Sequence, residues 1–74
     1  MGAKAFYVQI GAYADPNNAR RVVDGLQRAG LPGSTLPEAA NRHIVRVGPA
    51  STYADAKSLR SRIAGEYPQA VILP

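Results

Sequence analysis

Two segments of the sequence place side chains suited to binding a flat, polar ligand at alternate positions. The first contains Tyr7, Gln9 and Tyr13, and the second contains Arg42 and Arg46. Aromatic rings offer apolar faces for stacking, and amide and guanidinium groups donate hydrogen bonds to hydroxyl, amide and carboxylate oxygens. Because residues two apart on a β-strand project from the same face, each segment gathers these groups on one side. The pattern indicates non-covalent binding.

The other polar residues form no catalytic or metal-binding pattern. The single histidine, His43, shares parity with a predicted core face and is interpreted as structural, and the chain has no cysteine. We therefore predict that the protein is not an enzyme and has no catalytic residue, metal or cofactor. The acidic residues are all predicted to lie in caps, helices or loops: Asp15, Asp24, Glu38, Asp55 and Glu66.

Length and composition are those of one small folded domain. The chain has 74 residues, of which 46% are hydrophobic and 19% charged, and its net charge of +4 favours an anionic partner. No apolar run approaches the roughly 20 residues of a membrane helix, and the first residues lack the apolar stretch of a signal peptide. We predict a linker or artificial start over residues 1–4 and one domain over residues 5–74.

Residues 5–13 predict the first β-strand, because apolar and polar side chains alternate with period two. A helix is predicted next, with Asp15 as its cap and Pro16 at its first position. Apolar residues at helical spacing continue this helix until Gly30, a residue type that often ends helices. One face of the strand is predicted to carry Phe6, Val8 and Ile10, and the other Tyr7, Gln9, Gly11 and Tyr13.

The second half of the sequence repeats this order of elements. Residues 31–39 contain two internal prolines, so any strand there is expected to be short and to lie at a sheet edge. Residues 42–47 alternate again and predict a strand that ends at Gly48-Pro49. Ser51 or Thr52 is expected to cap a second helix, which ends near Gly65, and residues 69–73 predict a last strand.

The order βαββαβ predicts an α+β fold, a ferredoxin-like sandwich with a four-stranded antiparallel sheet and both helices on one face. In the order 4-1-3-2, the two strands with the clearest alternation are central, and the two with prolines are edges. The opposite face of the sheet is then free of helices. This face is expected to carry the tyrosine, glutamine and arginine side chains of the first and third strands.

The segments Tyr7-Val8-Gln9-Ile10-Gly11-Ala12-Tyr13 and Val45-Arg46-Val47-Gly48-Pro49 resemble the two signature segments of the SPOR family. The resemblance covers residues 5–73. It implies a fold like that of the RNA-recognition module and a non-catalytic domain that binds denuded glycan, the peptidoglycan strands that lack stem peptides. It also implies a periplasmic or other cell-envelope location, often at the division septum, where the domain would target a larger parent protein.

Residue by residue, the resemblance places the family's glycan groove on the helix-free face and its conserved first-strand amide at Gln9. Ala12 stands where many members have serine, while Arg42 and Ile44 stand where many have an aromatic residue and an arginine. We expect Arg42 and Arg46 to perform the polar contacts instead. The predicted glycan-binding residues are Tyr7, Gln9, Gly11, Ala12, Tyr13, Arg42, Ile44, Arg46 and Val71.

The expected partner is therefore the glycan of peptidoglycan, bound by a monomer that does not itself touch a membrane, although its parent protein can be anchored. Two alternatives remain open. A single-stranded nucleic-acid-binding module shares the fold and the basic charge, but the third strand lacks the aromatic residues of the RNA-recognition signature. A ferredoxin-like domain that binds a protein or a small regulatory ligand would use the helices or sheet edges.

Overall fold

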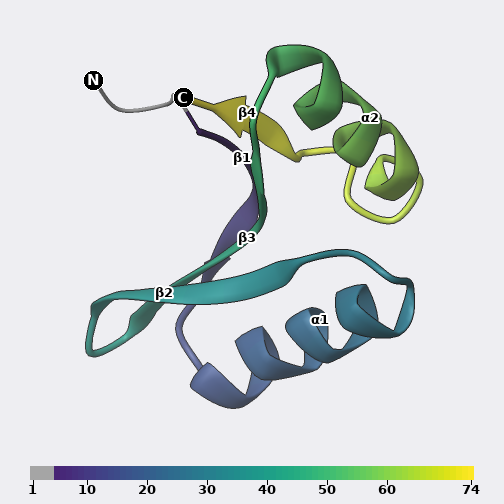
Figure 1. Ribbon diagram of the computed structural model, residues 1–74. Coiled ribbons are helices and arrows are strands. Elements are labelled where there is room, and N and C mark those ends of the chain that lie inside the picture. Colours follow the sequence, from purple (N-terminus) through teal and green to yellow (C-terminus); the bar gives the residue numbers. More distant parts are fainter. Residues whose placement is uncertain (1–4) are drawn as a thin grey trace.

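The computed structural model describes residues 5–74, so the predicted linker at residues 1–4 lies outside the described residues. Figure 1 shows a single sheet with one helix beside each half of it. The elements run β1 (Phe6–Tyr13), α1 (Pro16–Arg28), β2 (Gly33–Ala39), β3 (Arg42–Ala50), α2 (Tyr53–Ile63) and β4 (Val71–Leu73). The predicted βαββαβ order and the α+β fold are confirmed.

The sheet is antiparallel, and its strand order is β2-β3-β1-β4. The expected central and edge strands are confirmed, with Pro37 in one edge strand and Pro74 directly after the other. Besides β4, which spans only Val71–Leu73 of the predicted residues 69–73, two further strand lengths were wrong. β2 has 7 residues because an edge strand tolerates proline, and β3 continues through Gly48-Pro49 to Ala50.

Both helices begin at the predicted caps. The Asp15 carboxylate accepts a hydrogen bond of 2.8 Å from the Asn17 amide, and the Thr52 hydroxyl accepts one of 3.1 Å from the Asp55 amide. α1 contacts β2 and β3 most, and α2 contacts β1, β3 and β4 (Figure 1). Within residues 5–74, no helix combines the length and apolar character needed to cross a membrane.

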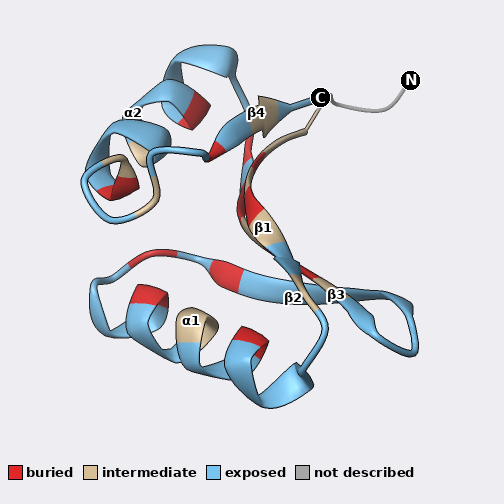
Figure 2. Cartoon of the chain, turned by 180° about the vertical axis from the view of Figure 1, so that it is seen from behind, coloured by how far each residue is buried: buried red, intermediate tan, exposed pale blue. Residues whose placement is uncertain are grey.

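The core lies between the two helices and the face of the sheet that they cover. Figure 2 shows the buried positions of both helices turned toward the strands. At the centre are four side chains with almost no exposed surface, as the strand alternation predicted: Val8, Ile10, Val45 and Val47. Because these four side chains point into the core, the residues that alternate with them in β3 and in the first half of β1 point to the helix-free face.

A β-bulge in β1 changes the face on which its second half presents side chains. Gln9 pairs with Arg46, but Gly11 pairs with the adjacent residue Val45, so Ile10 is the extra residue. Paired residues project to the same side of a sheet, and Val45 is buried in the core. Gly11 therefore faces the helices, and so does Tyr13, two residues further on. Their predicted position on the helix-free face was wrong, because strict alternation ignores the bulge.

Replacing Gly25 with alanine is expected to stabilise the domain. Gly25 is exposed inside α1, and a Cβ atom there would meet no atom of the described residues 5–74 within 4 Å, so close packing does not explain the glycine. Alanine is favoured over glycine in a helix by about 0.5 to 1 kcal/mol, which predicts a rise in Tm of about 3 to 6 °C. Thermal unfolding followed by circular dichroism measures this shift.

Gly30 provides the control for this prediction. It also has open space around it, but its φ of 79° lies in the left-handed region that disfavours alanine. Gly30→Ala should therefore lower Tm. A Gly25→Ala variant that melts below the wild-type chain would show that this position is not limited by helix propensity.

Candidate ligand-binding face

One row of residues crosses all four strands on the helix-free face. Arg46 of β3 pairs with Ser34 on β2 and with Gln9 on β1, and Gln9 in turn pairs with Val71 on β4. We call these four residues the central row. Ser34 and Val71 at its ends are exposed, and the two inner members are half-buried. The row brings hydroxyl, guanidinium, amide and apolar groups together.

Arg46 and Tyr7 form a stacked pair beside this row. The guanidinium carbon of Arg46 lies 3.9 Å from the centre of the Tyr7 ring, a distance at which a cation is attracted to the ring face. Nε of Arg46 is shielded from solvent and has no hydrogen-bond partner in the described part of the chain. Within residues 5–74, the Arg46 side chain forms no hydrogen bond and no ion pair. Its orientation is fixed while its charge stays uncompensated.

Apolar side chains surround the polar centre of the face. Leu73 pairs with Tyr7 and is 40% exposed, Leu36 on β2 is 42% exposed, and Val71 is 48% exposed. Ile44 also projects to this face, since it pairs with Leu36 and Ala12. However, Ile44, which is among the predicted glycan-binding residues, is only 5% exposed and offers little surface to a ligand. Its neighbours on β1 and β2, Ala12 and Leu36, flank it.

Two further predicted site residues lie at the end of the face near the β2–β3 turn. The bulge turns Ala12 toward the helix-free side, in agreement with its place in the resemblance. Nε of Arg42 lies 2.6 Å from the Glu38 carboxylate in an exposed ion pair. Such a pair contributes about 0 to 1 kcal/mol, but it partly compensates the charge of Arg42. Arg46 is thus the better placed of the two arginines to bind an anion.

Tyr13 lies on the helix side and packs against the core. Burial raises the pKa of Tyr67 above its usual value of 10.0, and the nearby Tyr13 and Glu66 raise it further. Since Tyr67 follows α2 and also packs against the core, this effect agrees with the position of Tyr13. Tyr7 is consequently the aromatic residue that the described chain presents on the helix-free face.

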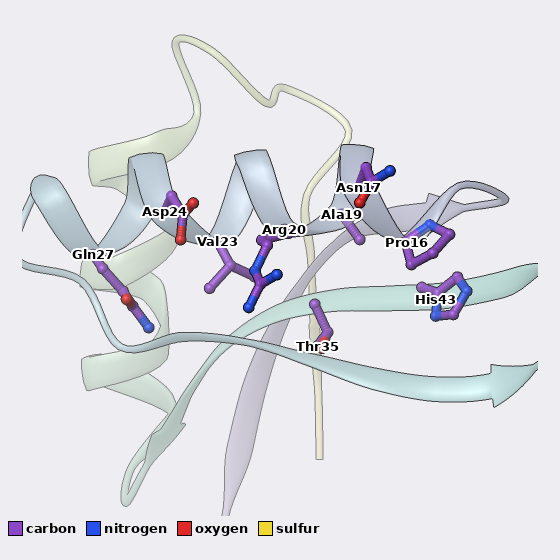
Figure 3. A pocket seen from close by; sticks show the side chains of 9 residues that line it. All are labelled: Pro16, Asn17, Ala19, Arg20, Val23, Asp24, Gln27, Thr35 and His43. Atoms are coloured by element: carbon purple, nitrogen blue, oxygen red, sulfur yellow. The ribbon is translucent and has the colours of Figure 1, made fainter.

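A separate cleft of about 470 Å³ lies under α1 on the helix side, and Figure 3 shows its side chains. His43 and Thr35 line its strand wall, and Arg20 and Asp24 line its helix wall. Nε2 of His43 is shielded from solvent and finds no hydrogen-bond partner among the described residues. The expected parity of His43 with the core face is confirmed. The cleft does not join the central row.

The acidic residues do not form a site. Glu38 lies within β2 rather than in a cap, helix or loop, so its predicted setting was wrong, but it pairs with Arg42. Among residues 5–74, no group of three histidine, cysteine or acidic side chains could hold a metal ion. The helix-free face therefore offers hydrogen-bond donors, apolar surface and two arginines, of which Arg42 is paired with Glu38 and Arg46 has no acidic partner among residues 5–74.

Two residues of this face were not predicted from the sequence. Ser34 and Leu36 lie on β2, where the prolines obscured any alternation. Leu73 of β4 pairs with Tyr7 and lies on the same face, although the predicted glycan-binding residues included only Val71 from this strand. The pairing of β2 with β3 assigns the first two to the face, and no local signal in the sequence could have done so.

Comparison with known proteins gives two findings. A family model described as the SPOR domain matches residues 2–74. The chain is also similar to a solved structure described as the solution structure of the peptidoglycan binding domain of the B. subtilis cell wall lytic enzyme CwlC, with a TM-score of 0.77 and 24% sequence identity. That match covers 99% of this chain and 92% of the other. A search of curated proteins finds no significant match.

Proposed function

We propose that this chain, which belongs to the SPOR domain family as its two signature segments predicted, binds peptidoglycan glycan strands that lack stem peptides. The observation that carries the proposal is the central row with the Tyr7–Arg46 stack on the helix-free face. The CwlC domain, which has the same fold, is described as binding peptidoglycan. The proposed role is binding without catalysis.

The chemistry of the ligand fits the groups on this face. Removal of the stem peptide frees the lactyl carboxylate of muramic acid, which gives the bare strand one negative charge per disaccharide. A guanidinium can meet a carboxylate with two parallel hydrogen bonds, and Arg46 has no acidic partner in the described chain. Gln9 can bond hydroxyl or acetamide groups, and Val71 and Leu73 can contact the apolar faces of the sugars.

A nucleic-acid ligand fits this face less well. Single-stranded nucleic acid is bound largely by stacking successive bases on exposed aromatic rings. In residues 5–74, Tyr7 is the aromatic residue on this face, and the Arg46 guanidinium covers its ring at 3.9 Å. Tyr13, which could have provided a second platform, packs against the core. The arrangement of these two tyrosines therefore favours glycan over nucleic acid as the ligand of this face.

We further propose a setting for the domain. It would act as a monomer in the periplasm or elsewhere in the bacterial cell envelope, without touching a membrane, and target a parent protein to the septum or to sites of wall remodelling. Fluorescence microscopy of the domain fused to a secreted reporter tests this localisation. Uniform labelling of the envelope in dividing cells would contradict septal targeting but not glycan binding.

The proposed function is tested by retention on purified sacculi. The domain should be retained by sacculi treated with an amidase that removes stem peptides and should pass over untreated sacculi. The reason is that amidase treatment creates the free carboxylate and exposes the sugars. Equal retention on both materials would contradict the preference for denuded glycan, and retention on single-stranded RNA alone would favour the nucleic-acid alternative.

A further inference from the structure

A hollow of about 270 Å³ runs along the outer edge of β4, between this strand and α2. Its helix wall is formed by Tyr53, Lys57 and Arg60, whose spacing places them on one side of α2. Val71 lines the hollow from the strand side and is also the last member of the central row. The hollow therefore adjoins the helix-free face at Val71.

Tyr53 presents an aromatic ring at this place. The residue is 55% exposed, more than any of the other exposed large hydrophobic residues in the described chain. Its ring meets Phe6 edge to face, with the centroids 6.0 Å apart and an interplanar angle of 74°. This contact orients the ring and leaves much of its surface open to solvent.

The charged groups of the hollow are all cationic. Nζ of Lys57 lies 5.9 Å from the centre of the Tyr53 ring, and Nε of Arg60 donates a hydrogen bond of 2.8 Å to the Ala70 carbonyl. Among residues 5–74, no acidic side chain lines the hollow. An open aromatic ring beside two cations matches a ligand with flat apolar faces and negative charges.

We propose that this hollow is an accessory subsite that binds a further sugar of the same anionic glycan, beyond the central row and across β4. Tyr53 stacks on the sugar, and Lys57 meets its carboxylate. This inference rests on the proposed function, and it predicts that longer glycans gain affinity from contacts that short ones cannot reach. The hollow and the central row share Val71, so one strand can occupy both.

An added peptide strand is the other ligand that a sheet edge can accept, and the geometry disfavours it. β4 has only 3 residues, which offers few outward backbone groups for pairing. The Ala70 carbonyl just before this edge already accepts the bond from Arg60. Peptide binding would also make no use of the open face of the Tyr53 ring.

The test compares Tyr53→Ala with the wild-type chain on a size-graded series of peptide-free peptidoglycan oligosaccharides, by isothermal titration. On the longest members, Tyr53→Ala should lose roughly two- to tenfold in affinity, the range expected for one aromatic contact. On the shortest members that still bind, it should match the wild-type chain. Tyr53→Phe keeps the ring and should behave as wild type throughout.

The outcomes separate this inference from the proposed function. If the wild-type chain binds oligosaccharides and Tyr53→Ala binds every length as tightly, the subsite does not exist, while the proposed function stands. If Tyr53→Ala weakens short and long members equally, Tyr53 acts through the central site or the fold, and the inference fails. Thermal melts of each variant show whether the fold is intact. A wild-type chain that binds no length would overturn both proposals.

Discussion

Replacing Arg46 with alanine is expected to weaken binding of peptide-free glycan roughly ten- to hundredfold while the domain remains folded. A hydrogen bond to a charged group contributes about 1.5 to 3 kcal/mol, which corresponds to this range. The Arg46 side chain is already held over Tyr7, so little ordering is needed when it meets a carboxylate. Gln9→Ala removes a neutral contact and should cost less, roughly two- to tenfold.

Titration of oligosaccharide into each variant measures these losses, and two further variants serve as controls. Arg21→Ala removes the same charge from an exposed position of α1 and should bind almost as the wild-type chain does. Tyr13→Ala should lower Tm but leave affinity unchanged, because Tyr13 packs on the helix side. If Arg21→Ala and Arg46→Ala lose affinity equally, net charge alone attracts the glycan and Arg46 has no specific contact.

The second large expected effect is a loss of stability when a core valine is replaced with alanine. A buried valine and an exposed valine, each replaced with alanine, provide the comparison. Val45 has no exposed surface and lies in the core, whereas Val71 is 48% exposed at the end of the central row. Val45→Ala removes two buried methyl groups and leaves a cavity, which should cost roughly 2 to 3 kcal/mol. For a domain of this size, Tm should fall by about 10 to 20 °C.

Val71→Ala should instead change Tm by only a few degrees and weaken glycan binding. At a temperature where both variants are folded, Val45→Ala should bind with wild-type affinity. Thermal melts and binding isotherms on the same two proteins give the complete pattern. If Val71→Ala melts early while Val45→Ala loses affinity, the two faces of the sheet have been assigned in reverse.

Local chemistry was sufficient for the boundaries of the helices and for the choice of central strands. Asp15 caps α1 because its carboxylate reaches an amide two residues away, and Gly30 follows that helix with a positive φ. Such effects involve neighbours in the chain, so they can be read from the sequence. The alternation likewise predicted the face of Gln9 and Arg46, because the register is unbroken between the pairs Val8–Val47 and Gln9–Arg46.

Pairing between distant strands decided the rest of the face. The bulge at Ile10 exists only as an offset between β1 and β3, and it turned Tyr13 toward the helices and Ala12 away from them. The burial of Ile44 depends on neighbours from β1 and β2, and Ser34 joined the central row through its partner Arg46. The sequence by itself determined which residue types were available and the fold that carries them. Which of them share a surface was decided by strand register, because register depends on two segments at once.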